Sequence, residues 1–235
     1  MANVIKHLSP NQGPRRNGLR PSLVVIHYTA MANVSAALER LCDPAAEVSA
    51  HYLIGADGDV IQMVEEDQRA WHAGQGEWAG EGDINSRSIG IELDNTGSHP
   101  FPEPQMSALE TLLQGISERW DIQPEGVIGH SDMAPGRKAD PGPHFDWARL
   151  ARQGLAGQGK PNPSSAAPST DTFTAHAKQA GFTADAPLET LLTATRLRFA
   201  PWRSGPLCAD DMNLCHTPAS KSEPRNRLTS HNVKR

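Results

Sequence analysis

Residues 22–29, Ser-Leu-Val-Val-Ile-His-Tyr-Thr, are the stretch that decides the fold. Four consecutive aliphatic residues without polar alternation, Leu23 to Ile26, predict a buried β-strand. His27 closes this run, at a place where a polar side chain costs free energy unless it has a partner or a role. The stretch therefore predicts a central strand and, at its end, the first candidate functional residue.

Strand and helix patterns interleave on the carboxyl side of this stretch. Further strands are expected at 51–54 and 60–64, joined by an Asp-Gly turn, at 88–93, where alternation predicts a half-buried strand, and at 126–129. Helices are expected where apolar residues recur with helical spacing, at 34–41 after an Asn33 cap, at 106–120, and briefly at 145–150. This order predicts an α/β fold with a mixed central β-sheet flanked by helices.

The composition changes after residue 153. Residues 1–153 carry the strong periodic signals, and we expect them to form the main domain. Residues 154–170 are rich in Gly, Ser and Pro, which predicts a flexible linker. Apolar helical stripes in 171–214 predict a small helical C-terminal appendage, a length that is short for independent stability. Residues 215–235 have no periodic pattern and predict a disordered basic tail.

Charge, hydropathy and cysteine content exclude several classes of protein. The 235 residues carry a net charge of −5, and the part before residue 216 alone carries −9, a poor match for nucleic acid. The longest aliphatic run is far shorter than the roughly 20 residues of a membrane helix. The first residues show no secretory signal, and the three cysteines are widely spread, so we expect a cytoplasmic protein, with the periplasm as the alternative.

Three polar residues stand where polarity is costly or a turn is tight: His27, His130 after the strand Val127-Ile128-Gly129, and Asp140 ten residues later. Two imidazoles and one carboxylate form a ligand set for Zn²⁺ that leaves a fourth position open, as in catalytic zinc sites. Simpler interpretations remain for each residue alone. Either histidine fits a hydrogen-bonded or surface position, and Asp140 before Pro141 fits a turn.

Two charged residues are candidates for the chemistry beside such a metal. Glu92 lies in the strand 88–93 on the face opposite Ile91 and Leu93, and near a zinc-bound water it would act as general base. Lys138, two residues before Asp140, would stabilise a developing oxyanion. Arg137 is a rival for that role. The alternatives are a solvent-facing glutamate and two surface cations.

The segment Trp71-His72-Ala73-Gly74 places an aromatic ring and an imidazole in a glycine-containing loop. Such a pair is suited to stack on, and hydrogen-bond to, a sugar or a peptide. Trp71 and His72 are therefore candidate substrate-binding residues, together with Arg137 and Asn85.

Five segments together resemble the zinc-dependent N-acetylmuramoyl-L-alanine amidases of the amidase-2 type, relatives of phage amidase lysozymes and peptidoglycan recognition proteins. They are VVIHYTA (24–30), SAHYLI (49–54), AWHAG (70–74), NSRSIGIEL (85–93) and GHSDMAPGRKADPGP (129–143). The resemblance implies one Zn²⁺ per chain, held by His27, His130 and Asp140. It implies Glu92 as the catalytic acid and base and Lys138 as the residue that stabilises the transition state.

The resemblance also implies a substrate. The reaction is hydrolysis of the amide between N-acetylmuramic acid, or its anhydro form, and L-alanine of the stem peptide, in cell-wall turnover or muropeptide recycling. Peptidoglycan fragments or murein would be the partners of a monomeric enzyme. Two alternatives are a peptidoglycan recognition module without catalysis and a zinc peptidase of stem peptides. Residues 171–214 faintly resemble a degenerate peptidoglycan-binding domain, and a short helical cap without a ligand is the alternative.

Overall fold

Strand β3 (Leu23–Tyr28) lies inside a six-stranded sheet, next to one edge strand, as its aliphatic run predicts. The computed structural model describes residues 4–159 and 167–215. The strand order of the sheet is β1-β5-β4-β7-β3-β8. The other strands of this sheet are β1 (Val4–Lys6), β4 (Tyr52–Ile54), β5 (Val60–Gln62), β7 (Ser88–Leu93) and β8 (Val127–Gly129). Strands β2 (Gln12–Pro14) and β6 (Gln68–Ala70) form a separate antiparallel pair.

Among the helices within 4–159 and 167–215, the first three lie between strands along the chain and the other four follow the last strand. The helices are α1 (Val34–Cys42), α2 (Ile84–Arg87), α3 (Glu103–Trp120), α4 (His130–Met133), α5 (Trp147–Arg152), α6 (Thr170–Gln179) and α7 (Leu188–Phe199). Four short 3₁₀ turns lie at 16–18, 44–46, 124–126 and 209–211. The Asn33 side chain accepts a hydrogen bond from the Ala36 N–H and caps α1, as the sequence predicts.

The sheet is mixed, which confirms the predicted α/β class. Strands β4, β7, β3 and β8 run parallel to one another, and β5 is antiparallel to β4 in the predicted hairpin. In the register of β3 and β7, His27 is paired with Glu92. The carboxyl ends of the parallel strands therefore meet at one edge of the sheet, which is where open α/β sheets place their functional groups.

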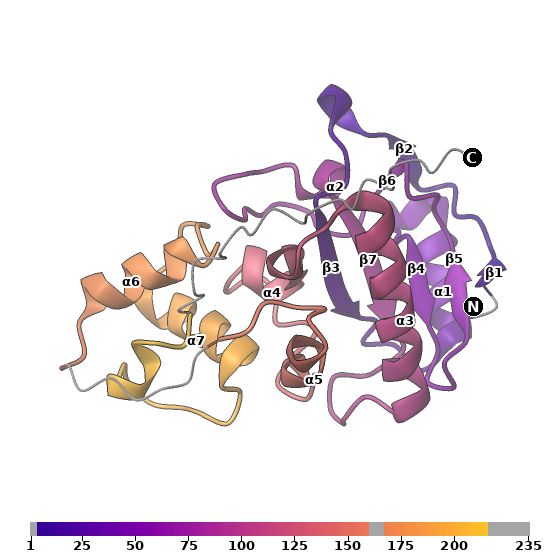
Figure 1. Cartoon of the computed structure of the whole chain (residues 1–235). Helices are drawn as coiled ribbons and strands as arrows, with labels where there is room; N and C mark the ends of the chain where they lie inside the picture. Colours follow the sequence, from indigo (N-terminus) through magenta and orange to yellow (C-terminus); the bar gives the residue numbers. More distant parts are fainter. Residues whose placement is uncertain (1–3, 160–166, 216–235) are drawn as a thin grey trace, which may run out of the picture.

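Each face of the sheet has its own apolar core. Helix α3 covers one face, where Leu109 and Leu113 pack with Val24, Ile26 and Ile91, and it lies across the sheet in Figure 1. On the other face, Ala37 and Leu41 of α1 pack against β4 and β5. The same face, nearer β3 and β8, is covered by α4, while α7 packs on α4 and α6 packs on α7.

The strand at 88–93 differs from the half-buried strand that its alternation predicts. Its residues are buried except Glu92, because β4 and β3 flank it and both of its faces are covered. Ile89, Ile91 and Leu93 face the α3 core, while Gly90 and Glu92 point to the other face. The placement of Glu92 opposite Ile91 and Leu93 agrees with the prediction.

The C-terminal helices share a core with the rest of the chain. Phe173 of α6 and Leu191 and Leu192 of α7 belong to the same buried cluster as Val25 and Ile128 of the sheet. A buried ion pair reinforces this packing, because the Arg198 guanidinium lies 3.1 Å from the Asp132 carboxylate of α4. The domain boundaries at 153 and 171 stay predictions, while the packing across them is continuous.

Parts of the predicted linker and nearly all of the predicted basic tail, at 160–166 and 216–235, lie outside the described residues. All three cysteines, Cys42, Cys208 and Cys215, are free thiols. Within the described part of the chain, no helix has both the length and the apolar character that a membrane crossing requires.

Candidate metal centre and catalytic cleft

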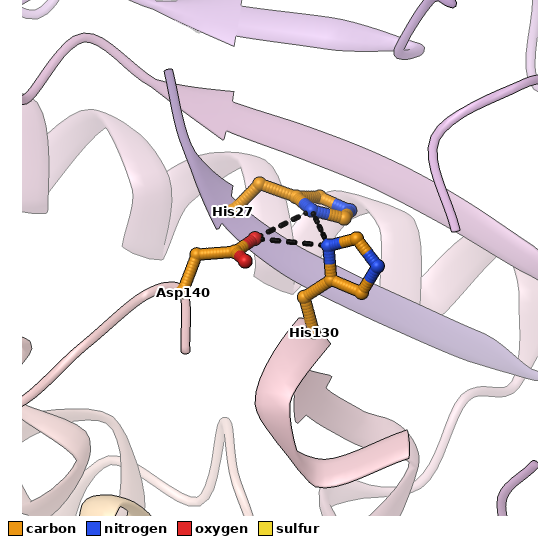
Figure 2. Close-up of side chains that lie close together, drawn as sticks. All are labelled: His27, His130 and Asp140. Atoms are coloured by element: carbon orange, nitrogen blue, oxygen red, sulfur yellow. Dashed lines mark hydrogen bonds and ion pairs between the residues drawn. The ribbon is translucent and has the colours of Figure 1, made fainter. Parts of the chain in front are cut away.

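The three predicted metal ligands come from three different elements and meet at the carboxyl edge of the sheet. His27 lies near the end of β3, His130 is the first residue of α4 directly after β8, and Asp140 lies in the loop that follows. Figure 2 shows their side chains pointing toward one another. The Nδ1 atoms of the two histidines are 2.9 Å apart, and Asp140 Oδ2 lies 2.9 Å from His27 Nδ1 and 3.0 Å from His130 Nδ1.

Burial sets the charge of this cluster. The His27 ring is 2% exposed, and burial together with the charge of His130 lowers the pKa of His27 to about 4. Burial alone would raise the pKa of Asp140, but its contacts with His130 and His27 outweigh burial and hold that pKa below its ordinary value. At neutral pH the cluster therefore contains a neutral His27 beside a carboxylate.

The donor set fits a zinc ion. His130 Nε2 lies 2.9 Å from the carbonyl oxygen of Ala73, which only accepts, so Nε2 carries the proton and Nδ1 presents its lone pair to the centre. His130 Nδ1 and Asp140 Oδ2 are thus two electron-rich atoms that face each other at 3.0 Å, with His27 Nδ1 2.9 Å from both, and a cation would relieve this arrangement. A tetrahedral zinc ion with bonds of about 2.0–2.1 Å keeps its ligand atoms about 3.3 Å apart, close to these separations. His27, His130 and Asp140 are the group within 4–159 and 167–215 whose donor atoms converge in this way.

Glu92 lies beside this cluster because β7 pairs with β3. Its register partner is His27, and the two side chains line the same cleft. The Glu92 Oε2 atom is shielded from solvent and has no hydrogen-bond partner among the described residues. Burial, with a smaller contribution from the Asp140 charge, raises the pKa of Glu92 to about 8, against the effect of Lys138. A carboxyl group of this kind exchanges a proton near neutral pH.

The two cations of the loop before Asp140 point to different places. Lys138 is exposed and lines the cleft, and its charge acts on Glu92 and His27. Arg137 also lines the cleft, but its guanidinium donates to the carbonyl oxygens of Ala73, at 2.7 Å, and Gln75. Arg137 thereby fastens the loop that follows His72. The Lys138 side chain makes no hydrogen bond of this kind with the described residues.

The predicted substrate-binding residues separate into two groups. Trp71 and His72 line the cleft, whereas Asn85 does not. Asn85 is buried, and its Oδ1 accepts hydrogen bonds from the backbone N–H groups of His72 and Ala73 at 3.0 and 2.8 Å. His72 is itself buried, with Nδ1 3.0 Å from His27 Nε2. The structure thus places Trp71 and His72 along the cleft, His72 buried beside His27, and Asn85 outside its lining.

The cleft has a volume of about 450 Å³, with the three ligands, Glu92 and Lys138 along it. A larger hollow of about 690 Å³ lies between α7 and the segment 201–207, but its lining has no cluster of ligand groups. Chemistry, rather than volume, therefore selects the cleft as the functional site.

Some residues of the cleft were not found from the sequence. Tyr28 and Arg40 line it. Ser88 is not part of the lining, but its hydroxyl oxygen is hydrogen-bonded to His72 Nε2. For Tyr28, the position directly after the candidate ligand His27 is the one sequence signal that could have indicated a place in the cleft. Arg40 and Ser88 have no such signal, because only the packing of α1 and of the 71–74 loop on the sheet brings them to the site.

Comparisons with known proteins agree on one family. The profile described as N-acetylmuramoyl-L-alanine amidase matches residues 17–143. N-acetylmuramoyl-L-alanine amidase AmiD of Escherichia coli is 42% identical over 152 residues, 58% of this chain and 54% of AmiD, so the match spans about half of that relative. The 1,6-anhydro-N-acetylmuramyl-L-alanine amidase AmpD of Enterobacter cloacae is 36% identical over 60% of this chain and 85% of its own.

Solved structures give the same result. AmpDh3 of Pseudomonas aeruginosa, in complex with anhydromuramic pentapeptide, superposes with a TM-score of 0.76 at 29% identity, covering 85% of this chain and 91% of that one. Escherichia coli AmiD, in complex with anhydro-N-acetylmuramic acid-L-Ala-D-γ-Glu-L-Lys, gives 0.74 at 30% identity, with 85% and 89% covered. Both matches extend beyond the 127 residues of the family profile.

Proposed function

The chain belongs to the N-acetylmuramoyl-L-alanine amidase family, and from that premise we propose that it hydrolyses the amide between muramic acid and L-alanine of peptidoglycan stem peptides. The observation that carries the proposal is the convergence of His27, His130 and Asp140 within 3.0 Å of one another, beside Glu92. These three side chains would hold one zinc ion per chain. When bound, zinc supplies a Lewis acid that polarises the scissile carbonyl group and acidifies water.

Glu92 moves the proton in this reaction. Its carboxylate takes a proton from the attacking water, whose oxygen forms a bond with the amide carbon. Glu92 then returns that proton to the alanine nitrogen as the C–N bond breaks, so the water is divided between the two products. Burial raises the pKa of Glu92 in the protein without the ion, and the positive charge of a bound cation would lower it again toward the ionised form that accepts the proton.

Lys138 would stabilise the negative charge that develops on the carbonyl oxygen. It is exposed in the cleft and free of the backbone contacts that hold Arg137. A fixed cation that meets charge only in the transition state raises kcat rather than binding. Trp71, at the wall of the cleft, would stack on the sugar or the peptide.

We favour soluble anhydro-muropeptides as substrate. Several relatives are named 1,6-anhydro-N-acetylmuramyl-L-alanine amidases, and two structural neighbours are complexes with anhydromuramic peptides. The three free thiols support a reducing, cytoplasmic location, with the periplasm as the alternative. The candidate catalytic groups form a complete set within one chain, so the reaction as proposed needs no second subunit.

The test is product analysis by mass spectrometry. The zinc-loaded protein is incubated with a purified anhydromuramyl peptide and, separately, with intact murein. Free anhydromuramic acid and an intact peptide are expected, and chelation should abolish their formation. A shortened peptide would instead identify a stem-peptide peptidase, and binding without any product would identify a recognition module.

A further inference from the structure

We propose that His72 is a positioning residue, which fixes the protonated nitrogen of the metal ligand His27 through a hydrogen-bond relay that begins at Ser88. The inference rests on the proposed function only in taking His27 as a ligand. It gives His72 a role behind the metal centre instead of a contact with substrate.

The relay begins at a serine hydroxyl whose proton has a single destination. Ser88 Oγ lies 2.6 Å from the carbonyl oxygen of Ile84, and a carbonyl only accepts, so the hydroxyl donates there. The same oxygen lies 3.1 Å from His72 Nε2. Because the Ser88 proton is already used, this second contact is a hydrogen bond in which His72 Nε2 donates.

The next contact passes this constraint to the ligand. The His72 ring is buried, and its two nitrogens meet only Ser88 Oγ and His27 Nε2, neither of them an anion, so the ring carries one proton, on Nε2, and a lone pair on Nδ1. His27 Nε2 lies 3.0 Å from that Nδ1 and must therefore donate to it. His27 then has no proton on Nδ1, the atom that faces His130 and Asp140. The lone pair is thereby directed at the metal position.

Packing holds the His72 ring in place. The ring lies against β7 at Gly90, where an added Cβ would come within 2.4 Å of His72 Cγ. It meets the His27 ring edge-on, with centroids 5.1 Å apart at 81°. Asn85 fixes the backbone of the same loop through the N–H groups of His72 and Ala73.

The second ligand has an equivalent but shorter arrangement. His130 Nε2 donates directly to the Ala73 carbonyl, one residue after His72. The loop 72–73 thus sets the proton position of both imidazole ligands, one by its backbone and one by its side chain. Such outer contacts typically change metal affinity by about 10- to 100-fold when they are removed.

The test uses the full chain and reads the proton position directly. In the metal-free protein, ¹⁵N NMR of the histidine rings should show His27 protonated at Nε2. His72→Phe, which keeps a ring but has no acceptor, should lose this preference and bind zinc about 10- to 100-fold more weakly in competition with a chromogenic chelator. Ser88→Ala, which removes the acceptor for His72 Nε2, should give the same change in His27 with a smaller loss of affinity.

Ser9→Ala is the matched control, because Ser9 is also buried and hydrogen-bonded to a carbonyl, but its hydroxyl bonds Leu41 and Asn11 rather than any member of this relay. Its zinc affinity should equal that of the original protein. A His27 protonated at Nδ1 in the original protein would overturn the proposal, as would unchanged zinc affinity in Ser88→Ala. If His72→Phe does not fold, the spectrum of the original protein and the Ser88 variant decide.

The outcome is separable from that of the proposed function. A relay that tunes zinc affinity in a protein that cleaves no muropeptide would refute the amidase activity alone. Full amide hydrolysis with zinc affinity insensitive to both variants would refute the relay alone.

Discussion

Replacing Glu92 with Gln should make the metal-free protein more stable and should strongly reduce the activity of the zinc-loaded protein. Glutamine has nearly the same shape, but it cannot ionise or carry a proton. The Glu92 carboxylate is penalised by burial, which raises its pKa from the ordinary 4.5 to about 8. That difference corresponds to at most about 5 kcal/mol, and the open cleft makes the true value smaller, because water screens the charge.

The sign follows from where the proton is held. Between pH 4.5 and 8 the unfolded chain releases the Glu92 proton while the folded chain keeps it, so this group lowers the free energy of unfolding as pH rises. Below pH 4.5 both states are protonated and the penalty vanishes. The variant should therefore match the original protein near pH 4 and exceed it by several kcal/mol at pH 8.

Urea denaturation of the chelator-treated proteins at a series of pH values measures this difference. Glu118→Gln, on the exposed side of α3, is the control and should stay within about 0.5 kcal/mol throughout. Zinc-loaded Glu92→Gln should keep its metal and lose about 10²- to 10⁴-fold in kcat. An equal pH dependence in Glu92→Gln and the original protein would refute the buried-carboxyl argument, and full activity would refute the proton-transfer role.

Three further substitutions test other parts of the site. Lys138→Ala should lower kcat by about 10²-fold with zinc retained, measured by steady-state kinetics and metal analysis, and an unchanged kcat would remove Lys138 from the reaction. Arg198→Leu should lower the free energy of unfolding by about 3–5 kcal/mol, because it leaves the Asp132 carboxylate buried without its counter-ion, and a loss under 1 kcal/mol in urea would contradict this. Gly90→Ala should displace the His72 ring and weaken zinc binding, and an unchanged metal titration would show that the ring can move away freely.

The sequence predicted the elements whose period is unambiguous. The aliphatic run at 23–26, the capped helix after Asn33 and the hairpin at 51–64 are all found where the patterns place them. The degree of burial of 88–93 was not predictable, because it depends on which strands flank it rather than on its own residues. Strands β1, β2 and β6 were not predicted, because β2 (Gln-Gly-Pro) and β6 (Gln-Arg-Ala) lack an apolar run and β1 (Val-Ile-Lys) is exposed at the edge of the sheet.

Two of the proposed ligands stand out in the sequence because His27 and His130 lie at the ends of apolar strands, and the resemblance joined Asp140, in a loop rich in Pro and Gly, to them. The contacts behind the ligands were not. Ser88 and Asn85 act through backbone and ring atoms that come together only after folding. Arg198 lies 66 residues from its partner Asp132, in a helix whose pattern suggests only packing.

Arg198 connects the C-terminal helices to residues 1–153, from which the change in composition separates them in the sequence. Its guanidinium donates to Asp132 and to the Val127 carbonyl and lies 3.6 Å above the Trp147 ring. Asp132 in turn accepts from the Gly129 N–H, one residue before His130. Shortening the protein to its first 153 residues would thus remove the cation that pairs with Asp132, two residues after the proposed zinc ligand His130. If another module replaced these helices, it would need a cation at the position of the Arg198 guanidinium to pair with Asp132.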